Sequence, residues 1–381
     1  MHSLPYWRLA FFYFVYFAVI GGLSPYWGLY LEHIGLTPKL IGVVMAIPML
    51  TRIVAPNIWG WVASRTGKPL QVMLFGCVGA ALCFIGVIWR KDVAGLIAFT
   101  LAFSFFWNAI LAQFEVLTLG YLKDTPEKYG QIRSWGSIGF VLVVAGLGVV
   151  FDHLPIYLLP WCIFFFLIAI LIAAFSLPND SAARGSQTKT SFVAALKQRK
   201  VVYFLITVFL IQFSLGIFHA FYSLYLDYYG YSKTAIGSLW ALGAIAEIVL
   251  FMSMPALLRR FSINWLLGLA IVTTALRWFL LGAYPQLLWV VIIAQLFHAF
   301  TFGLTHAVAI EFVRRHFPGS AQSQGQSFYS AIGFGASNAL GSLAGGVIWD
   351  VSVGLLFNAA LLIVMFAGAV HVYQMRSSQA N

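Results

Sequence analysis

The sequence predicts an all-α membrane protein whose twelve transmembrane helices form two pseudo-symmetric six-helix bundles. Three observations support this prediction: the composition, a series of long apolar runs, and a repeat between the two halves of the chain. Of the 381 residues, 61% are hydrophobic and only 9% are charged. Soluble domains are about half apolar and a quarter charged, so this chain is expected to lie in lipid.

Twelve apolar runs of about 20 residues follow one another, each long enough to cross a hydrocarbon core of about 30 Å. We place the spans at 6–31, 40–63, 70–89, 93–121, 132–151, 156–177, 201–226, 233–257, 263–282, 286–313, 322–349 and 353–375. The runs are unbroken, whereas the strands of a membrane β-barrel alternate over about ten residues, so helices are expected. Kinks are expected at five prolines inside the spans, namely Pro25, Pro48, Pro56, Pro160 and Pro255.

Positive charges predict the orientation of these spans. With a cytoplasmic N-terminus, 16 of the 22 Lys and Arg residues fall on cytoplasmic ends and loops, four fall on the other side, and Arg52 and Arg277 lie inside spans. This bias favours a bacterial inner (cytoplasmic) membrane protein with both termini in the cytoplasm. The net charge of +11 is therefore a sign of topology, and nucleic acid is not expected as a partner.

A repeat relates the two halves of the chain. The segments LYLEHIGLTPKLIG and LYLDYYGYSKTAIG begin at Leu29 and Leu224, a separation of 195 residues. The same separation pairs Phe14 with Phe209 and Arg65 with Arg260, so six spans repeat as six spans. The predicted domains are an N-terminal bundle over 1–177, a polar cytoplasmic linker over 178–200 and a C-terminal bundle over 201–381.

Ionisable residues lie within or at the edges of the predicted spans. They are Arg52, Glu115, Arg133, Glu247, Arg277, His298, His306 and Glu311. Each charge near mid-membrane costs about 2.5–3.5 kcal/mol on insertion scales, so such residues usually serve a function. The structural alternatives are a static ion pair between helices, an ordinary core histidine, or a side chain that reaches the membrane surface, as expected for Glu311 and Arg133.

The repeat also relates two of these charges, because Glu247 occupies the repeat position of Arg52. If both helices line a cavity, this acid and this base face each other where the halves meet. His298 and His306 are eight residues apart, about 80° around a helix, so both can contact one wall. Glu247 with the two histidines is the expected proton-coupling group.

Several motifs resemble lactose permease and its relatives in the major facilitator superfamily. The segment YGQIRSWGSIGF (129–140) resembles the start of that family's fifth span, and Glu115 precedes Arg133 by 18 residues, as its sugar-binding Glu and Arg do. The segments AEIVLFMSMPALLRRFS, TALRWFLLGA and QLFHAFTFGLTHAVA place Glu247, Arg277 and His298 on the family's coupling residues. The resemblance implies the major facilitator fold, with substrate bound between the halves and access that alternates.

Four positions depart from the pattern of that family. Thr301 replaces the carboxylate that follows the coupling His, and Gln295 replaces a Lys, so the proton is expected on Glu247 with His298. Phe140 replaces the Trp that stacks on the sugar ring. Ser64 replaces the usual Asp in GWVASRTGK, the loop between spans two and three.

Arg52, the pair of histidines and the stretch YGYSKTAIGSLWALGAIAE resemble the phenylpropionate permease branch more closely. The resemblance implies proton-coupled uptake of an aromatic carboxylic acid. The expected substrate-binding residues are Arg52, Glu115, Arg133, Phe140, Arg277 and His298. The expected proton-coupling residues are Glu247, His298 and His306.

Other functions remain open at this stage. A sugar or nucleoside symporter and an efflux antiporter use the same scaffold. An intramembrane enzyme is disfavoured because the sequence lacks a His-Glu-x-x-His or Gly-x-Ser-x-Gly motif, and a channel does not explain the repeat. No cofactor and no metal site is expected. The expected partners are a small-molecule substrate, protons and the lipid bilayer, and the protein is expected to act as a monomer.

Overall fold

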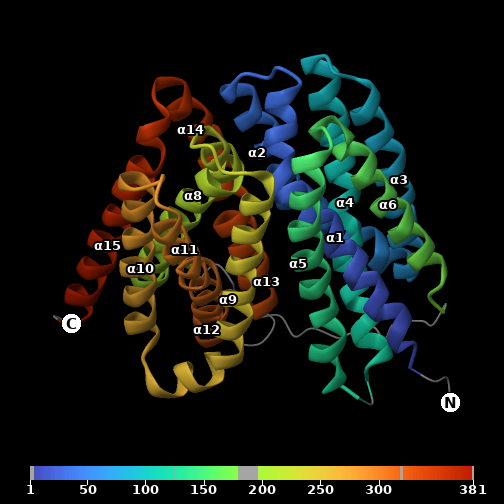
Figure 1. Ribbon diagram of the computed structural model, residues 1–381. Helices are drawn as coiled ribbons and strands as arrows, with labels where there is room; N and C mark the ends of the chain where they lie inside the picture. Colours follow the sequence, from blue (N-terminus) through green and yellow to red (C-terminus); the bar gives the residue numbers. More distant parts are fainter. Residues whose placement is uncertain (1–3, 124, 179–195, 318–320, 380–381) are drawn as a thin grey trace. The chain divides into compact units, whose positions relative to one another are not determined.

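The computed structural model describes residues 4–123, 125–178, 196–317 and 321–379. Within those residues, twelve helical segments are long and apolar enough to cross a membrane (Figure 1). The predicted all-α fold with twelve spans is confirmed, and the predicted ends differ from the observed ends by at most four residues. Lipid offers no hydrogen-bond partner to the backbone, which is why every span is helical.

Contacts between Cα atoms divide the chain into two compact units. Unit 1 comprises Met1–Thr37, Ile47–Gly185 and Ser232–Ala241, and unit 2 comprises Pro38–Ala46, Ser186–Tyr231 and Leu242–Asn381. The start of α2 thus belongs to unit 2, and the rest of that helix to unit 1. For α9 the reverse holds, because its start belongs to unit 1 and the rest to unit 2. The bundle limits predicted from the sequence, 1–177 and 201–381, stay a prediction. Most of the predicted linker, residues 179–195, lies outside the described residues.

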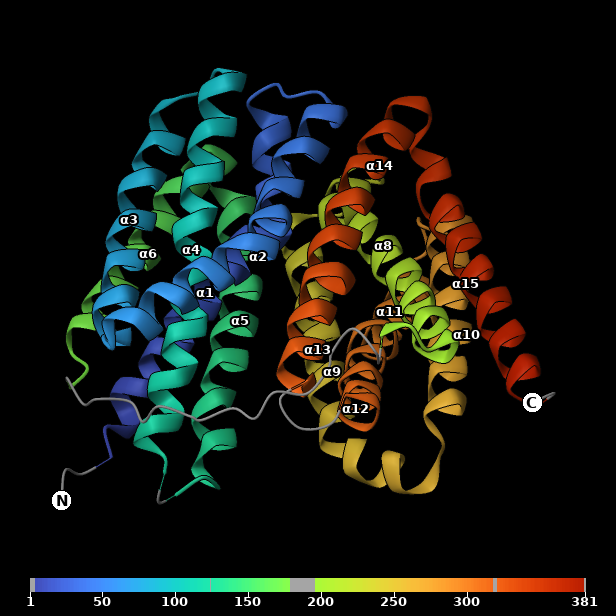
Figure 2. The same cartoon turned by 180° about the vertical axis from the view of Figure 1, so that it is seen from behind.

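Unit 1 contains most of the first six spans. They are α1 (Tyr6–His33), α2 (Pro38–Thr66), α3 (Pro69–Trp89), α4 (Val93–Tyr121), α5 (Lys128–His153), the short η1 (Ile156–Leu158) and α6 (Leu159–Phe175). Helix α1 packs on α5 and α6, and α3 packs on α4 and α6, as Figure 2 also shows. The second half of α2 packs on α4, where the Trp59 indole donates a 3.0 Å hydrogen bond to the Phe105 carbonyl.

Unit 2 contains most of the remaining spans. They are α8 (Arg199–Tyr228), α9 (Lys233–Arg260), α10 (Ile263–Ala283), α11 (Leu288–Leu296) continued by η2 (Ala299–Leu304) and α12 (Thr305–His316), α13 (Ala321–Tyr329) continued by η3 (Ser330–Ala336) and α14 (Ser337–Val351), and η4 (Val353–Leu355) followed by α15 (Leu356–Gln379). Helix α8 packs on α14 and α15, and α10 packs on α15, α11 and α12. Among the described spans, α1 and α8 have the largest buried shares, so each is the central helix of its unit.

Two features of the helices differ from or extend the sequence prediction. Pro160 is the second residue of α6, where the missing N–H of proline has no helical partner to lose, so the kink predicted there was wrong. Pro25, Pro48, Pro56 and Pro255 do lie inside helices, and their kinks stay a prediction. The segments η2 and η3 are π-helices, which the sequence analysis did not predict.

A carboxylate at the end of α5 holds the start of α9 within unit 1. Asp152 accepts hydrogen bonds from the backbone N–H groups of Lys233 (2.7 Å) and Thr234 (3.0 Å). Ser232 accepts from the next two amides, those of Ala235 and Ile236. Three amides at the start of α9 that an isolated helix leaves without partners, those of Lys233, Thr234 and Ala235, are therefore satisfied, and the Ile236 N–H makes the first bond within the helix.

A related carboxylate lies at the end of α14 within unit 2. The segment GVIWD ends at Asp350 as GVVFD ends at Asp152, and Asp350 lies 3.2 Å from the ammonium group of Lys39 near the start of α2. The first residue of α2 is Pro38, which has no N–H to donate. The partner of the Asp350 carboxylate is thus the Lys39 ammonium group, whereas the partners of the Asp152 carboxylate are two backbone N–H groups.

We predict that Asp152→Ala lowers the stability of the purified protein by about 1 kcal/mol, because two helix-start amides lose their acceptor. A thermal unfolding scan in detergent measures the change. The matched variant Asp350→Ala is expected to have a smaller effect, since an exposed ion pair contributes about 0–1 kcal/mol. Equal losses of stability in the two variants contradict the role of Asp152 as a cap for the start of α9.

Candidate functional site

Glu115 of α4 and Arg133 of α5 form an ion pair in unit 1. Arg133 Nε lies 3.8 Å from Glu115 Oε1. The hydroxyl of Tyr129, one helical turn before Arg133, donates a 2.8 Å hydrogen bond to Glu115 Oε2. The Arg133 and Glu115 side chains are 32% and 27% exposed. Each charge is therefore compensated by the other, while both groups remain accessible from the surface of the unit.

Aromatic rings of α1 surround the Arg133 guanidinium. Its Cζ atom lies 4.2 Å from the ring centroid of Phe17 and 5.4 Å from that of Tyr13, within the range of a cation–π interaction. Gly136 makes this approach possible, because a Cβ atom at this position would lie 2.7 Å from Phe17 Cδ2 and 2.9 Å from Arg133 Nη1. Unit 1 thus presents a paired cation on an aromatic surface.

Arg52 and Phe140 are the other two residues predicted for this region. Arg52 of α2 is exposed on unit 1, and Phe140 of α5 is half-buried about two turns beyond Arg133. Arg52 and Arg133 both lie within electrostatic range of Tyr16, whose ring stacks on Trp107 with centroids 4.3 Å apart. The predicted approach of Arg52 to Glu247 involves both units and stays a prediction.

Arg277 of α10 is a fully buried cation in unit 2. Its side chain has no exposed surface, and its Nη2 atom donates a 3.1 Å hydrogen bond to Gln295 Oε1 of α11. The rings of Phe218 and Trp278 lie 4.1 and 4.6 Å from its Cζ atom. Nε and Nη1 have no hydrogen-bond partner among the described residues. No ion pair joins Arg277 to a carboxylate in this part of the chain.

Glu247 of α9 lies beside His298, the residue just before η2. The nearest atoms, His298 Nε2 and Glu247 Oε2, are 4.0 Å apart. Gly303 of η2 lets the two helices approach, because a Cβ atom there would lie 3.2 Å from Glu247 Cγ. His298 is buried, with 7% of its surface exposed. The structure therefore places a partly buried carboxylate beside a buried imidazole in unit 2.

His298 and His306 form a column with the intervening Phe302. Centroids of the His298 and Phe302 rings are 5.9 Å apart with an interplanar angle of 2°, and those of Phe302 and His306 are 6.1 Å apart at 10°. His306 Nδ1 also lies 3.3 Å from the hydroxyl of Tyr329 on α13. Both imidazoles thus lie next to the same ring, with all three planes nearly parallel.

Two polar pairs also belong to this region, and of their four residues only Thr301 was singled out from the sequence. His219 of α8 lies 2.9 Å, Nδ1 to Oδ1, from Asn338 of α14, and the Thr274 hydroxyl lies 3.2 Å from that of Thr301. Their type and spacing carry no signal in the sequence, because histidine and threonine occur widely in apolar spans. The His219–Asn338 contact joins α8 and α14, which are far apart in the chain, whereas Thr274 and Thr301 lie on successive spans.

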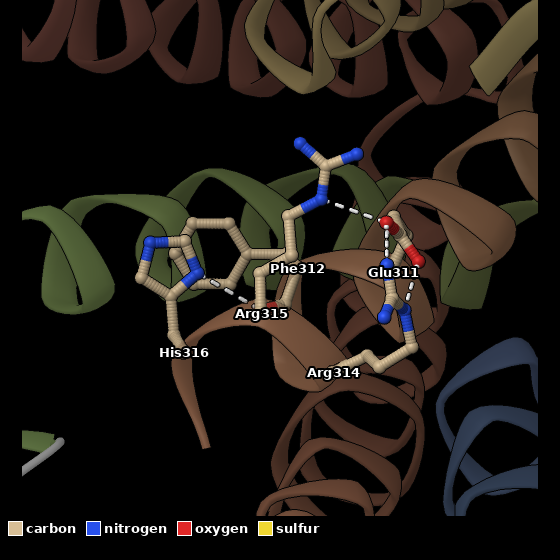
Figure 3. A network of polar contacts seen from close by, with 5 residues as sticks. All are labelled: Glu311, Phe312, Arg314, Arg315 and His316. Atoms are coloured by element: carbon tan, nitrogen blue, oxygen red, sulfur yellow. Dashed lines mark hydrogen bonds and ion pairs between the residues drawn. The ribbon is translucent and has the colours of Figure 1, made fainter. Parts of the chain in front are cut away.

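Glu311 has a local structural role. Its carboxylate accepts two hydrogen bonds of 2.6 Å from Arg314 and one of 2.7 Å from Arg315, as Figure 3 shows. These residues are three and four positions apart and occupy one face of the last turns of α12. Glu311 is therefore neutralised at the helix end, in line with the expected surface role.

The fold and these buried charges define the class of the protein, a multi-pass membrane transporter, and comparisons with known proteins give its family. The family model described as "MFS_1 like family" matches residues 6–359. The chain belongs to this family of the major facilitator superfamily. Its relatives and structural neighbours are transporters, so the chain is a secondary transporter and not an enzyme.

Two curated relatives match most of the chain. The "Probable 3-phenylpropionic acid transporter" of Escherichia coli (strain K12) is 30% identical over 349 residues, which cover 90% of each chain. The "Maltose permease" of Geobacillus stearothermophilus is 29% identical over 358 residues, 93% of this chain and 91% of the relative.

Solved structures share the fold. A variant of the nucleoside transporter NupG has a TM-score of 0.89 at 15% identity, covering 98% of this chain and 100% of that chain. The transporter PepTSo of the POT family has a TM-score of 0.77 at 11% identity, covering 99% and 98%. At such identities the likeness extends to the fold alone.

We predict opposite stability effects for two arginine replacements. Arg277→Met is expected to raise stability by about 1–2 kcal/mol, because it removes a buried charge without a carboxylate, and to abolish transport. Arg133→Met leaves Glu115 without its cation and is expected to lower stability. Thermal unfolding and uptake measurements test both variants. If Arg277→Met loses more stability than Arg133→Met, Arg277 is not a destabilising buried cation.

Proposed function

We propose that this transporter imports a small organic anion with an aromatic body, such as a 3-phenylpropionate-like acid, together with protons. It acts as a monomer in a bacterial inner membrane, with both termini in the cytoplasm. The distribution of Lys and Arg supports this orientation. The 30% identity to a probable 3-phenylpropionic acid transporter supports the substrate class.

The observation that carries the proposal is the fully buried Arg277, which has no carboxylate partner among the residues that the structure describes. An uncompensated cation in a low-dielectric region costs several kcal/mol, and a substrate carboxylate offsets that cost. Phe218 and Trp278 cover the guanidinium in this conformation, so substrate reaches it only as unit 2 rearranges during alternating access. His298, which is packed on the Phe218 ring, belongs to the same proposed binding region.

In unit 1, Arg133 on its aromatic surface receives the substrate, with Arg52 and Phe140 as further binding residues. A guanidinium laid across rings suits a ligand that combines a carboxylate with an aromatic body. Glu115 holds Arg133 in position through the ion pair and limits its attraction for anions. The proposal thus gives Arg133 a recognition role and Glu115 a positioning role.

Glu247, His298 and His306 carry the proton. Glu247 and His298 are close enough to exchange a proton through one small movement or one water molecule. Protonation of Glu247 removes a charge from the transport pathway and allows the loaded transporter to change conformation. Thr301, which takes the place of a carboxylate in the lactose permease pattern, is hydrogen-bonded to Thr274 and Phe297 and serves as structural support.

A sugar or nucleoside is the second candidate substrate. The geometry that favours it is the Glu115–Arg133 pair with Tyr129, because a carboxylate beside a guanidinium offers both acceptors and donors to hydroxyl groups. The 29% identity to a maltose permease supports the same alternative.

Uptake by proteoliposomes tests the substrate class. We expect saturable uptake of labelled 3-phenylpropionate at an external pH of about 7, faster with an alkaline interior, and none of maltose or uridine. Protein-free liposomes control for diffusion of the neutral acid. Uptake of maltose or uridine instead establishes the second candidate, and proton release on substrate entry contradicts symport.

We predict that Glu247→Gln retains substrate exchange at close to the original rate but loses uphill accumulation by at least tenfold, because the amide cannot change its charge. Counterflow and proton-driven uptake in proteoliposomes separate the two activities. The matched variant Glu311→Gln, which alters a carboxylate of the same unit held by Arg314 and Arg315, is expected to accumulate substrate normally. Full accumulation by Glu247→Gln removes Glu247 from the mechanism.

A further inference from the structure

The column of His298, Phe302 and His306 has an unusual chemical order. The two outer rings are imidazoles, which accept and donate protons, and the middle ring is benzene, which does neither. The three rings are nearly parallel, with successive centroids 5.9 and 6.1 Å apart. The two imidazoles are therefore held close to each other and kept from direct contact by one side chain.

The π-helix η2 produces this alignment. Residues four apart on an α-helix overshoot a full turn by about 40°, so eight residues accumulate about 80°. A π-helix has more residues per turn, and four residues fall short of a full turn. In the continuous stretch from α11 through η2 to α12, these two deviations offset each other. The result is a run of three nearly parallel rings, each in contact with the next, over eight residues of this stretch.

Charged and titratable groups face both ends of the column. Glu247 of α9 is 4.0 Å from His298, and Arg277 of α10 and His219 of α8 lie within electrostatic range of it. At the other end, the Tyr329 hydroxyl of α13 lies 3.3 Å from His306. Phe302 thus separates the carboxylate end of the column from the end nearest Tyr329.

A second aromatic residue covers the side of the column. Phe334 of η3 makes edge-to-face contacts with Phe302 and His306, with centroids 5.8 and 5.4 Å apart. Phe334 is buried, whereas Phe302 is half-buried. Phe334 therefore covers one side of the column, and the Phe302 ring is partly exposed.

We propose that Phe302 is a barrier to proton movement between the Glu247–His298 group and His306. The proton passes from one imidazole to the other only when the Phe302 ring moves aside and water or direct contact replaces it. This positioning role deepens the proposed proton coupling and rests on it. The barrier keeps protons from crossing without substrate, because the phenyl ring between the two imidazoles neither donates nor accepts a proton.

Proton flux through proteoliposomes without substrate tests the barrier. We expect Phe302→His to raise flux under an imposed pH gradient by at least tenfold, because three imidazoles in line can relay a proton. Phe302→Ala is expected to leak as well, because the gap between two imidazoles is polar enough to hold water. An internal pH-sensitive dye records the flux, and valinomycin with K⁺ clamps the potential.

Two further variants separate a relay from loosened packing. Phe300→His introduces the same side chain on the same π-helix outside the column, and its flux is expected to equal that of the original protein. Adding His306→Phe to Phe302→His is expected to return the flux to the original level, because the line of imidazoles is broken again. Thermal unfolding scans establish that each variant is folded.

The proposal is overturned if folded Phe302→His and Phe302→Ala both remain as tight as the original protein. It is also overturned if Phe300→His leaks equally, or if His306→Phe fails to suppress the leak. Failure of the proposed function gives a different result. In that case the original protein shows no proton movement when substrate is added, whatever the Phe302 variants do. The two failures are therefore distinguishable in one set of liposomes.

Discussion

The constraint on which this structure depends is the absence of hydrogen-bond partners in lipid. It makes every span helical, because a helix satisfies its own backbone. It also makes each charge inside a span expensive unless a partner compensates it. The chain meets the first demand in the same way throughout its described residues, and it meets the second differently in its two units.

Unit 1 compensates its charges. Arg133 has Glu115 as a counter-ion and the rings of Tyr13 and Phe17 as neighbours, and Glu115 has the Tyr129 hydroxyl as a further donor. Unit 2 buries Arg277 without a carboxylate and sets Glu247 beside an imidazole whose Nδ1 atom has no hydrogen-bond partner among the described residues. A protein keeps such a destabilising arrangement where function requires it. In the proposed mechanism, charge compensation therefore changes in unit 2 during transport.

The repeat extends to the spans but not to the details of the backbone. The stretches of unit 1 that correspond to η2 and η3 at a separation of 195 lie in the regular helices α4 and α5. Both π-helices in the described chain belong to unit 2 and carry Phe302 and Phe334, which touch. π-helical turns often occur at functional sites. Divergence of the halves therefore accompanies the concentration of titratable side chains in unit 2.

The sequence by itself determined the fold class and the twelve spans, and it indicated which charged residues are candidates for function. Hydropathy is a local property, and the price of an exposed backbone or a bare charge in lipid is large enough to be evident in composition alone. The resemblance to the family indicated Glu115 and Arg133 as substrate-binding residues, and the structure shows that the two form an ion pair. Only the tertiary structure decided that Asp152 caps α9, that Arg277 lacks a carboxylate in its unit, and that Phe302 separates two histidines. These facts depend on contacts between helices distant in the chain and on a π-helical turn whose energy differs little from that of an α-helix, so no local pattern of residues determines them.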